Sequence, residues 1–152
     1  MPYIGRDKQA EKAQGCVFCR ALKQEDGPEN LVVHRGKTAF VIVNRFPYTS
    51  GHLMVLPFAH VARLDEIDED TRAEMMELMT EATLVLTRVY NPGGFNLGAN
   101  LGAAAGAGIE EHLHVHILPR WVGDTNFIST VGETRVLPET LEETWQRVKA
   151  AW

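Results

Sequence analysis

The 152-residue sequence has few of the features that mark membrane-spanning or secreted proteins. It contains no run of about 18 apolar residues, the length that spans a bilayer as a helix. It has only 2 cysteines, which are too few for a disulfide framework. The first 15 residues are polar and lack the apolar stretch of a secretory signal. We therefore expect no membrane segment and a cytoplasmic protein.

Positive charge is also scarce, because 15 Lys and Arg residues stand against 20 Asp and Glu residues. The net charge of -5 argues against nucleic acid or a membrane surface as a partner, since both are held by a basic surface. A small anionic ligand needs only a local group of donors and is not excluded. Apolar residues make up 45% and charged residues 23% of the chain, which is the balance of a single globular domain.

Short segments rich in β-forming residues alternate with helical patterns. The expected strands cover residues 31–33, 38–43, 52–56, 95–100 and 112–118. Tight turns connect the early strands, so they pair as antiparallel neighbours. The sequence therefore predicts an α+β fold with an antiparallel sheet.

One long helix is predicted where apolar residues recur at three- and four-residue spacing over residues 64–89. Thr71 and Glu74 have the spacing of a capping box, which places the start of the regular helix at Thr71. The run Asn91-Pro92-Gly93-Gly94 ends it.

The domain organisation is simple. We expect residues 1–15 to form a flexible N-terminal arm and residues 16–152 to form one domain, with a C-terminal extension from about residue 120. Residues 123–132 are expected to be irregular. A last helix is predicted after Pro138, capped by Thr140 and Glu143.

The strand at residues 112–118 carries the clearest chemical signal. His112, His114 and His116 alternate with apolar residues, so all three project from one face of a strand. Such a group either contributes to a transition-metal site or acts on an anionic substrate as nucleophile and proton carrier. On one flat strand the three are too far apart to bind one zinc ion together. The Gly/Ala run at 102–108 is a chain that can approach phosphate closely.

Cys16 and Cys19 have C-x-x-C spacing. In a cytoplasmic chain this spacing indicates either a redox pair or half of a metal site.

The pattern of residues 112–118 resembles the signature of the histidine triad superfamily of nucleotide hydrolases and transferases. Residues 40–47, 51–57 and 16–19 resemble three upstream elements of the same fold, so the resemblance covers roughly residues 16–128. Residues 119–127 further resemble the branch that acts on dinucleoside polyphosphates, including bacterial diadenosine tetraphosphate phosphorylases. The resemblance implies a sheet of about five antiparallel strands with one long helix, a short helix and a C-terminal helix.

The resemblance also implies a mechanism. His114 matches the nucleophile that attacks the α-phosphorus of a nucleotide and forms a nucleotidyl-histidine intermediate. Phosphate or water then accepts the nucleotidyl group. His116 matches a residue that bonds phosphate oxygen, and His52 one that packs beside the triad. Asn44 matches the position that bonds the ribose, and Asn100 a position that reaches the phosphate chain.

Further substrate contacts follow from the same resemblance. The residues Phe40, Ile42 and Phe46 are candidates for the base pocket, and Trp121 for a second base or a subunit contact. Many members carry Gln at the position of Gly108. Either backbone N–H groups around Ala107 and Gly108 replace that amide, or the space admits another group, such as inorganic phosphate.

In several bacterial relatives a structural zinc ion is held by residues that match Cys16, Cys19, His60 and His112. All four residue types are present here, and they form a set suited to closed tetrahedral zinc. His112 is then a ligand and not a proton carrier. The alternative is a metal-free, reduced pair of thiols. Members of the superfamily are usually homodimers, so we expect at least a dimer.

Two other functions are compatible with the same residues. One is hydrolysis of nucleoside phosphoramidates or mononucleotide esters, and the other is a nucleotide-binding module whose triad is idle. A zinc-finger module is disfavoured, because Cys19, His60 and His112 are too far apart in the sequence and the net charge is negative.

Overall fold

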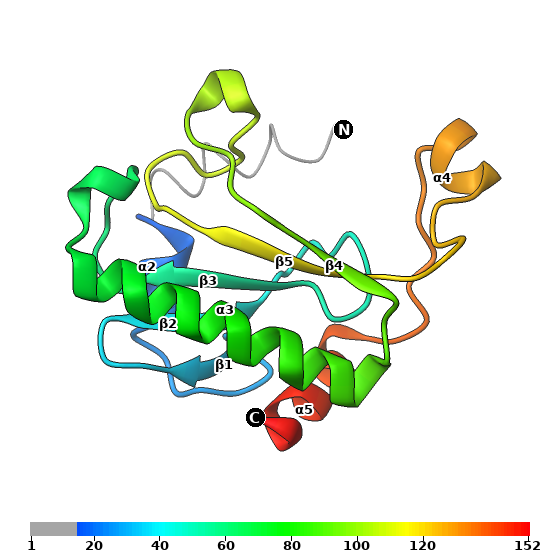
Figure 1. The fold of residues 1–152 in the computed structure, drawn as a ribbon, viewed down its shortest axis with the longest axis horizontal. Helices are drawn as coiled ribbons and strands as arrows, with labels where there is room; N and C mark the ends of the chain where they lie inside the picture. Colours follow the sequence, from blue (N-terminus) through cyan, green and yellow to red (C-terminus); the bar gives the residue numbers. More distant parts are fainter. Residues whose placement is uncertain (1–14) are drawn as a thin grey trace.

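The computed structural model describes residues 15–152 and contains a five-stranded antiparallel sheet in the order β1-β2-β3-β5-β4 (Figure 1). The strands are β1 (Val32–Arg35), β2 (Ala39–Val43), β3 (Leu53–Pro57), β4 (Gly94–Gly98) and β5 (Val115–Arg120). The predicted α+β fold is confirmed. The arm expected at residues 1–15 falls, apart from residue 15, outside the described residues.

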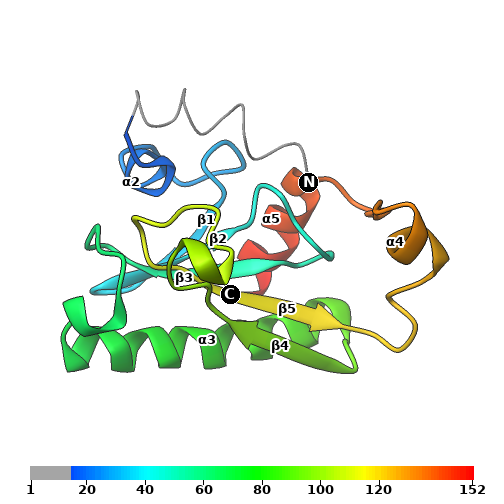
Figure 2. The same cartoon turned by 90° about the horizontal axis from the view of Figure 1, so that it is seen from above.

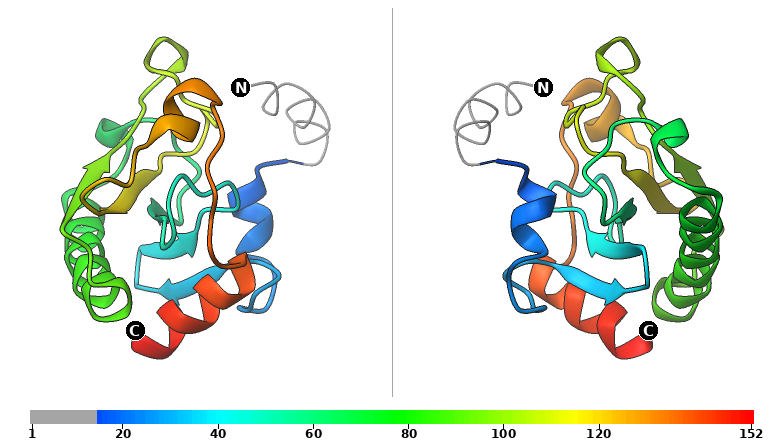
Figure 3. Two further views of the ribbon diagram at one scale, coloured as in Figure 1. Left: turned by 90° about the vertical axis from the view of Figure 1, so that its right-hand side faces the viewer. Right: turned by 90° about the vertical axis from the view of Figure 1, so that its left-hand side faces the viewer.

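The described residues also form four α-helices and two short 3-10 turns. They are α2 (Val17–Ala21), α3 (Glu69–Tyr90), α4 (Phe127–Val131), α5 (Leu141–Ala151), η1 (Leu64–Glu66) and η2 (Ala103–Ala105). Helix α3 runs along one side of the sheet and α2 lies on the other side (Figures 2 and 3). Within residues 15–152, no helix has the length and apolar character needed to cross a membrane.

The core lies between α3 and the sheet. The side chains of α3 that face it are Thr71, Met75, Leu78, Met79, Ala82, Val85 and Leu86. Strands β2 and β3 are buried along their whole length. Helix α3 packs against both strands, and α5 also contacts β2. The periodicity that predicts a long helix is therefore confirmed as a core-facing stripe.

The predicted start of this helix is wrong. Helix α3 begins at Glu69, because Asp68 is the N-cap and its carboxylate accepts the N–H of Thr71 at 2.7 Å. Glu74 does not close a capping box. Its carboxylate accepts hydrogen bonds from Lys37 N at 2.7 Å and Ala39 N at 2.9 Å in the turn between β1 and β2. An acidic residue three positions before Thr71 is itself a strong cap, which left Glu74 available for this tertiary contact.

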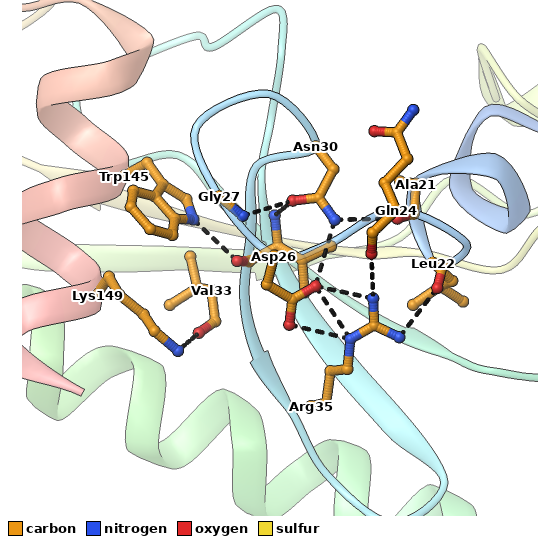
Figure 4. A network of polar contacts seen from close by, with 11 residues as sticks. Ala21, Leu22, Gln24, Asp26, Gly27, Asn30, Val33, Arg35, Trp145 and Lys149 are labelled. Carbon is orange, nitrogen blue, oxygen red and sulfur yellow. Dashed lines mark hydrogen bonds and ion pairs between the residues drawn. The ribbon is translucent and has the colours of Figure 1, made fainter.

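Helix α5 covers the free edge of β1. Trp145 Nε1 donates to Val32 O and Lys149 Nζ donates to Val33 O, each at 2.8 Å (Figure 4). The predicted cap of α5 is confirmed, since Thr140 and Glu143 form a capping box. An edge strand whose carbonyls already have donors is protected from pairing with another chain.

His34, also on β1, stacks on Trp152 with ring centroids 5.1 Å apart.

The same strand holds α2 in place. The Arg35 guanidinium donates to Asp26 at 2.8 Å and to the carbonyl oxygen of Leu22 at 3.1 Å (Figure 4). Asn30 donates to Ala21 O at 2.9 Å. These contacts tie the C-terminal end of α2 to the sheet, and so they fix the position of Cys16 and Cys19 at its start.

Residues 123–132, expected to be irregular, contain α4. The Asn126 side chain accepts from Ile128 N at 3.1 Å and from Ser129 N at 3.4 Å, which caps the helix. Asn is among the preferred N-cap residues, so the sequence held a signal for this helix. Helix α4 projects away from the sheet beyond the end of β5 (Figure 1).

Candidate active site and metal site

The three histidines of residues 112–116 lie at the start of β5, with His116 inside the strand and His112 and His114 before it. Strand β5 begins at Val115, later than predicted, and only Leu53–Val55 of β3 pair with it. Beyond that point the two strands no longer pair. Pro57 has no N–H to donate to the ladder, its carbonyl oxygen faces His112 Nε2, and Leu113 N donates to Val61 O at 2.7 Å. The three side chains therefore have different surroundings.

His112 is fully buried and faces the two cysteines. Its Nε2 lies 2.9 Å from the carbonyl oxygen of Pro57. A carbonyl oxygen only accepts, so Nε2 carries the hydrogen and Nδ1 has a free lone pair. That Nδ1 lies 3.4 Å from the sulfur of Cys16 and 3.7 Å from that of Cys19. The backbone thus fixes the tautomer that a metal ligand needs.

Cys16, Cys19, His60 and His112 form one cluster, as predicted. Their ligand atoms all lie within 4.8 Å of one another, and Cys19 Sγ is 3.4 Å from His60 Nδ1. Bonds of about 2.3 Å to sulfur and about 2.0–2.1 Å to nitrogen in a tetrahedral site separate a sulfur from a nitrogen by ~3.6 Å. The three sulfur–nitrogen distances of 3.4, 3.4 and 3.7 Å are close to this value. The four residues can therefore hold a metal ion.

His114 has the opposite arrangement of hydrogens from His112. Its Nδ1 lies 2.8 Å from the carbonyl oxygen of His112 and donates to it, so Nε2 keeps the lone pair. Burial lowers the pKa of His114, which keeps the ring neutral near pH 7. The residue is 7% exposed, and its ring contacts those of Phe18 and His116 at 5.6 Å and 5.0 Å between centroids. Its environment is therefore largely dry.

His52 and His116 are linked by a directed hydrogen bond. The N–H of Tyr48 donates to His52 Nδ1 at 3.1 Å, so the hydrogen of His52 is on Nε2. That Nε2 lies 2.8 Å from His116 Nδ1 and donates to it. His116 consequently carries its own hydrogen on Nε2, where it is a donor.

The rings of His52 and His116 stay neutral. Burial, with a smaller effect of neighbouring histidines, lowers the pKa of His52 to about 3 and that of His116 to about 4.

Two adjacent rings therefore have complementary roles. His114 offers a lone pair at Nε2, and His116 offers an N–H at Nε2. A neutral imidazole with its second nitrogen held by an acceptor is a competent nucleophile, and a neighbouring donor stabilises negative charge on the group it attacks. The arrangement is suited to attack on a centre that carries anionic oxygen.

The residues predicted to contact the ribose and the base have different degrees of burial. Asn44 is buried, its Oδ1 accepts from Phe46 N at 3.0 Å, and its Nδ2 lies 3.4 Å from His52 Nδ1, the nitrogen that keeps the lone pair. Phe46 is 56% exposed, whereas Ile42 is buried. Phe40 has no exposed surface and stacks on Phe58 with centroids 5.6 Å apart. In this structure Phe40 is therefore a core residue, and Phe46 is the exposed member of the predicted set.

The Gly/Ala loop positions Asn100, Ala107 and Gly108. Gly102 and Gly106 have φ values of 84° and 85°, which let the chain turn tightly around η2. Ala107 N donates to Gly102 O at 3.3 Å, so this amide already has a partner within the loop. Asn100 Nδ2 donates to Gly106 O at 3.5 Å. The space beside Gly108 is open, since no heavy atom lies within 4 Å of a side chain placed there.

Two aromatic residues near the histidines are absent from the sequence-based site. Phe18 contacts His112 and His114, and Tyr48 contacts His52 and His116 with centroids 4.5 Å and 5.8 Å apart. The sequence offers one signal for each residue: Phe18 lies between the two cysteines, and Tyr48 lies four residues before His52.

Trp121 donates from Nε1 to Tyr90 O at 3.3 Å and packs at the end of α3. It lies on the wall of a cavity beyond Tyr48.

Comparison with known proteins identifies the family of this chain. The HIT domain family model matches residues 25–122. The chain is 42% identical over 149 residues to AP-4-A phosphorylase from Mycobacterium tuberculosis, and the match covers 98% of this chain and 76% of that protein.

Solved structures share the fold, including the following two. A hypothetical histidine triad nucleotide-binding protein from Sulfolobus tokodaii is 29% identical with a TM-score of 0.71, covering 90% of this chain and 91% of that one. A Zn-bound histidine triad family protein from Mycobacterium smegmatis is 25% identical with a TM-score of 0.72, covering 91% of this chain and 93% of that one.

Proposed function

Since this chain belongs to the HIT domain family, we propose that it transfers a nucleotidyl group from a dinucleoside polyphosphate, such as diadenosine tetraphosphate, to phosphate or water. The observation that carries the proposal is the pair of Nε2 atoms on His114 and His116, one with a lone pair and one with a hydrogen. The similarity to AP-4-A phosphorylase supports the substrate class.

The reaction has two displacements at phosphorus. In the first, His114 Nε2 forms a bond to the α-phosphorus, and the bond from that phosphorus to the bridging oxygen breaks. The remaining nucleotide leaves with the electron pair of that bond. The Nε2–H of His116 donates to a phosphate oxygen and stabilises the added charge. In the second displacement an oxygen of phosphate or water attacks the same phosphorus, and the bond to His114 breaks.

The other predicted contacts hold the substrate in this scheme. Asn44 binds the ribose, Phe46 and Ile42 contact the base, and Asn100 reaches the phosphate chain. The open space beside Gly108 is the proposed place for an accepting inorganic phosphate, because it adjoins the segment that bears His112 and His114.

We also infer that the metal is zinc and that its role is structural. Two sulfur and two nitrogen donors at the measured separations suit Zn²⁺, and a related Zn-bound protein has the same fold. Four protein ligands leave no open coordination position for water or substrate. The metal would therefore cross-link parts of the chain and would not act as a Lewis acid on the substrate. It would join α2 to the segment that carries His114.

The free edge of the sheet supports the expected homodimer. Strand β4 pairs only with β5 among the described strands, and Leu97 on it is 51% exposed. Met76 and Leu84, on the outer surface of α3, are also exposed. An exposed edge with apolar side chains is suited to pair with a second copy. We expect a dimer by light scattering, and a Leu97→Asp variant that is monomeric.

The proposed reaction is tested by product analysis with diadenosine tetraphosphate and ³²P-labelled inorganic phosphate. Label in ADP, with unlabelled ATP as the other product, supports phosphorolysis. Rates and products that do not respond to phosphate support hydrolysis by water. Turnover of adenosine 5′-phosphoramidate but not of the dinucleotide contradicts the proposed substrate class. Nucleotide binding without turnover of either compound contradicts catalysis.

A further inference from the structure

A cavity of about 440 Å³ lies beyond Tyr48, outside the site described above. Its walls include Tyr48, Tyr90, Trp121, Ile128, Arg135 and Arg147. It is bounded by the turn before β3, the end of α3 and the segment that carries α4. Its volume is in the range of small-molecule sites, which is about 300–1,000 Å³.

The cavity is separated from the histidines by one aromatic ring. The ring contacts run from His114 to His116 at 5.0 Å and from His116 to Tyr48 at 5.8 Å between centroids. Tyr48 is 40% exposed and also lines the cavity. Tyr48 is therefore the residue that the cavity shares with the surroundings of His116.

The cavity has one positive charge that no carboxylate in the described part of the chain neutralises. Of its acidic residues, Asp124 pairs with Arg120 at 2.6 Å and Glu139 pairs with Arg147 at 2.7 Å. Arg135 instead donates to the carbonyl oxygen of Tyr48 at 3.2 Å. A carbonyl oxygen carries no net charge, so the Arg135 guanidinium remains available to an anionic group.

The walls also present apolar and aromatic surface. Ile128 is 48% exposed and Val136 is 80% exposed, although both line the cavity. Together with Tyr48 they offer the kind of surface on which a flat aromatic ring packs. The combination of aromatic wall, exposed apolar side chains and one free guanidinium is complementary to a base that carries phosphate.

We propose that this cavity is a subsite for the second nucleotide of the substrate, the one whose phosphates leave when His114 attacks. This inference rests on the proposed function and adds the residues that make the enzyme select a dinucleotide. Arg135 binds the polyphosphate near the distal ribose, and Tyr48 and Ile128 contact the distal base. Most of these walls come from residues 124–147, after the segment that matches the family model, so the subsite belongs to the C-terminal segment of this chain.

The test measures binding in a His114→Ala background, in which ligand is not consumed. Calorimetric titrations use diadenosine tetraphosphate and AMP as separate probes. Arg135→Ala and Ile128→Ala are each expected to raise the Kd for diadenosine tetraphosphate about 10-fold or more, since each removes a contact to the distal half. The Kd for AMP, which lacks that half, is expected to change less than about 2-fold.

Arg88→Ala is the matched control. Arg88 is another exposed arginine that donates to a backbone carbonyl, that of Ala151 at 2.8 Å, but it does not line the cavity. It is expected to leave both Kd values unchanged. An Arg135→Ala variant that binds the dinucleotide as tightly as its parent overturns the subsite, as does one that loses affinity equally for AMP. If the parent binds neither probe, the proposed function fails first and the subsite fails with it.

Discussion

Nε2 of His52 lies 2.8 Å from Nδ1 of His116, and this hydrogen bond decides which nitrogen of His116 carries a hydrogen. His52 is itself oriented by the backbone N–H of Tyr48. The Tyr48 N–H donates to His52, His52 donates to His116, and the remaining N–H of His116 points to the proposed phosphate site. His52 is a positioning residue in this scheme, because it acts through His116.

Replacing His52 tests this relay. His52→Leu removes the donor to His116, so the tautomer of His116 is no longer fixed. A lost hydrogen bond to a buried group costs about 1–3 kcal/mol, and kcat with diadenosine tetraphosphate is expected to fall about 10–100-fold with little change in KM.

His52→Gln is the matched variant, since its amide N–H can take the place of Nε2–H. It is expected to recover part of the lost kcat. Equal loss in both variants would mean that His52 contributes packing alone.

Replacing His114 tests the nucleophile. His114→Ala is expected to lower kcat at least about 100-fold, because it removes the atom that forms the covalent intermediate. Rapid quench of a single turnover with labelled substrate should trap label on the parent protein and none on the variant.

His34→Ala provides the control, since His34 stacks on Trp152 away from the site. Its rate is expected to match the parent. A His114→Ala variant that keeps more than about a hundredth of the parental kcat refutes the assignment.

Residues whose role depends on local pattern were predictable from the sequence. The apolar periodicity of residues 64–89 identified α3, and Thr140 with Glu143 identified the cap of α5, because both depend on neighbours along the chain. The cluster of Cys16, Cys19, His60 and His112 was predicted as a set from its resemblance to a known family, and the structure brings the four together.

Features that depend on tertiary contacts were not predictable in this way. The partner of Glu74 is a turn 35–37 residues earlier in the chain, and spacing alone matched it to Thr71. The different surroundings of His112 and His114 arise because β3 ends at Pro57 and Leu113 bonds to Val61 instead. A regular strand pattern contains no information on where its partner strand stops.

The metal site gives a direct chemical prediction. Protein purified without chelators is expected to contain about one zinc per chain, and Cys16→Ser/Cys19→Ser is expected to contain none and to melt at a lower temperature. A site that joins α2 to the residues before β5 contributes folding free energy when the metal binds.

Atomic emission spectroscopy measures the metal, and calorimetry the melting temperature. Restoring zinc should raise the melting temperature of stripped parent protein but not that of the double variant. Less than about a tenth of an equivalent in the parent would exclude a resident zinc.

The contact between Glu74 and the β1–β2 turn gives a stability prediction. The Glu74 carboxylate accepts from Lys37 N, from Ala39 N and from the Thr38 hydroxyl, the last at 2.6 Å. Burial raises the pKa of Glu74, but these hydrogen bonds outweigh it and the net shift is downward. Glu74→Ala is expected to lower the free energy of unfolding by about 2 kcal/mol or more, because it leaves several donors without their charged acceptor.

Urea denaturation measures this loss, and Glu77→Ala is the control. Glu77 is an exposed residue on the same helix, and its replacement is expected to change the free energy by less than about 0.5 kcal/mol. Similar losses in the two variants would show that the turn is not anchored by Glu74.

Acid should destabilise the fold through the neutral histidines. His52 and His116 have pKa values lowered to about 3 and about 4 in the folded protein, whereas in the unfolded chain each titrates near about 6.5. Between these limits the unfolded state binds more protons than the folded state, so the free energy of unfolding falls as the pH falls. Above about pH 6.5 the two histidines make their full contribution to the free energy of unfolding, and below about pH 3 this contribution is fully lost.

Within that window each group contributes a slope of about 1.4 kcal/mol per pH unit. Urea denaturation of the parent and of His52→Gln at four pH values between about 4.5 and 7.5 measures it. The Gln side chain does not titrate, so the slope of the variant should be smaller by the contribution of His52. Protonation of the metal ligands affects both proteins and cancels in the difference between the slopes. Equal slopes would show that His52 has the same proton affinity in the folded and unfolded states, and the neutral relay from Tyr48 to His116 would then be wrong.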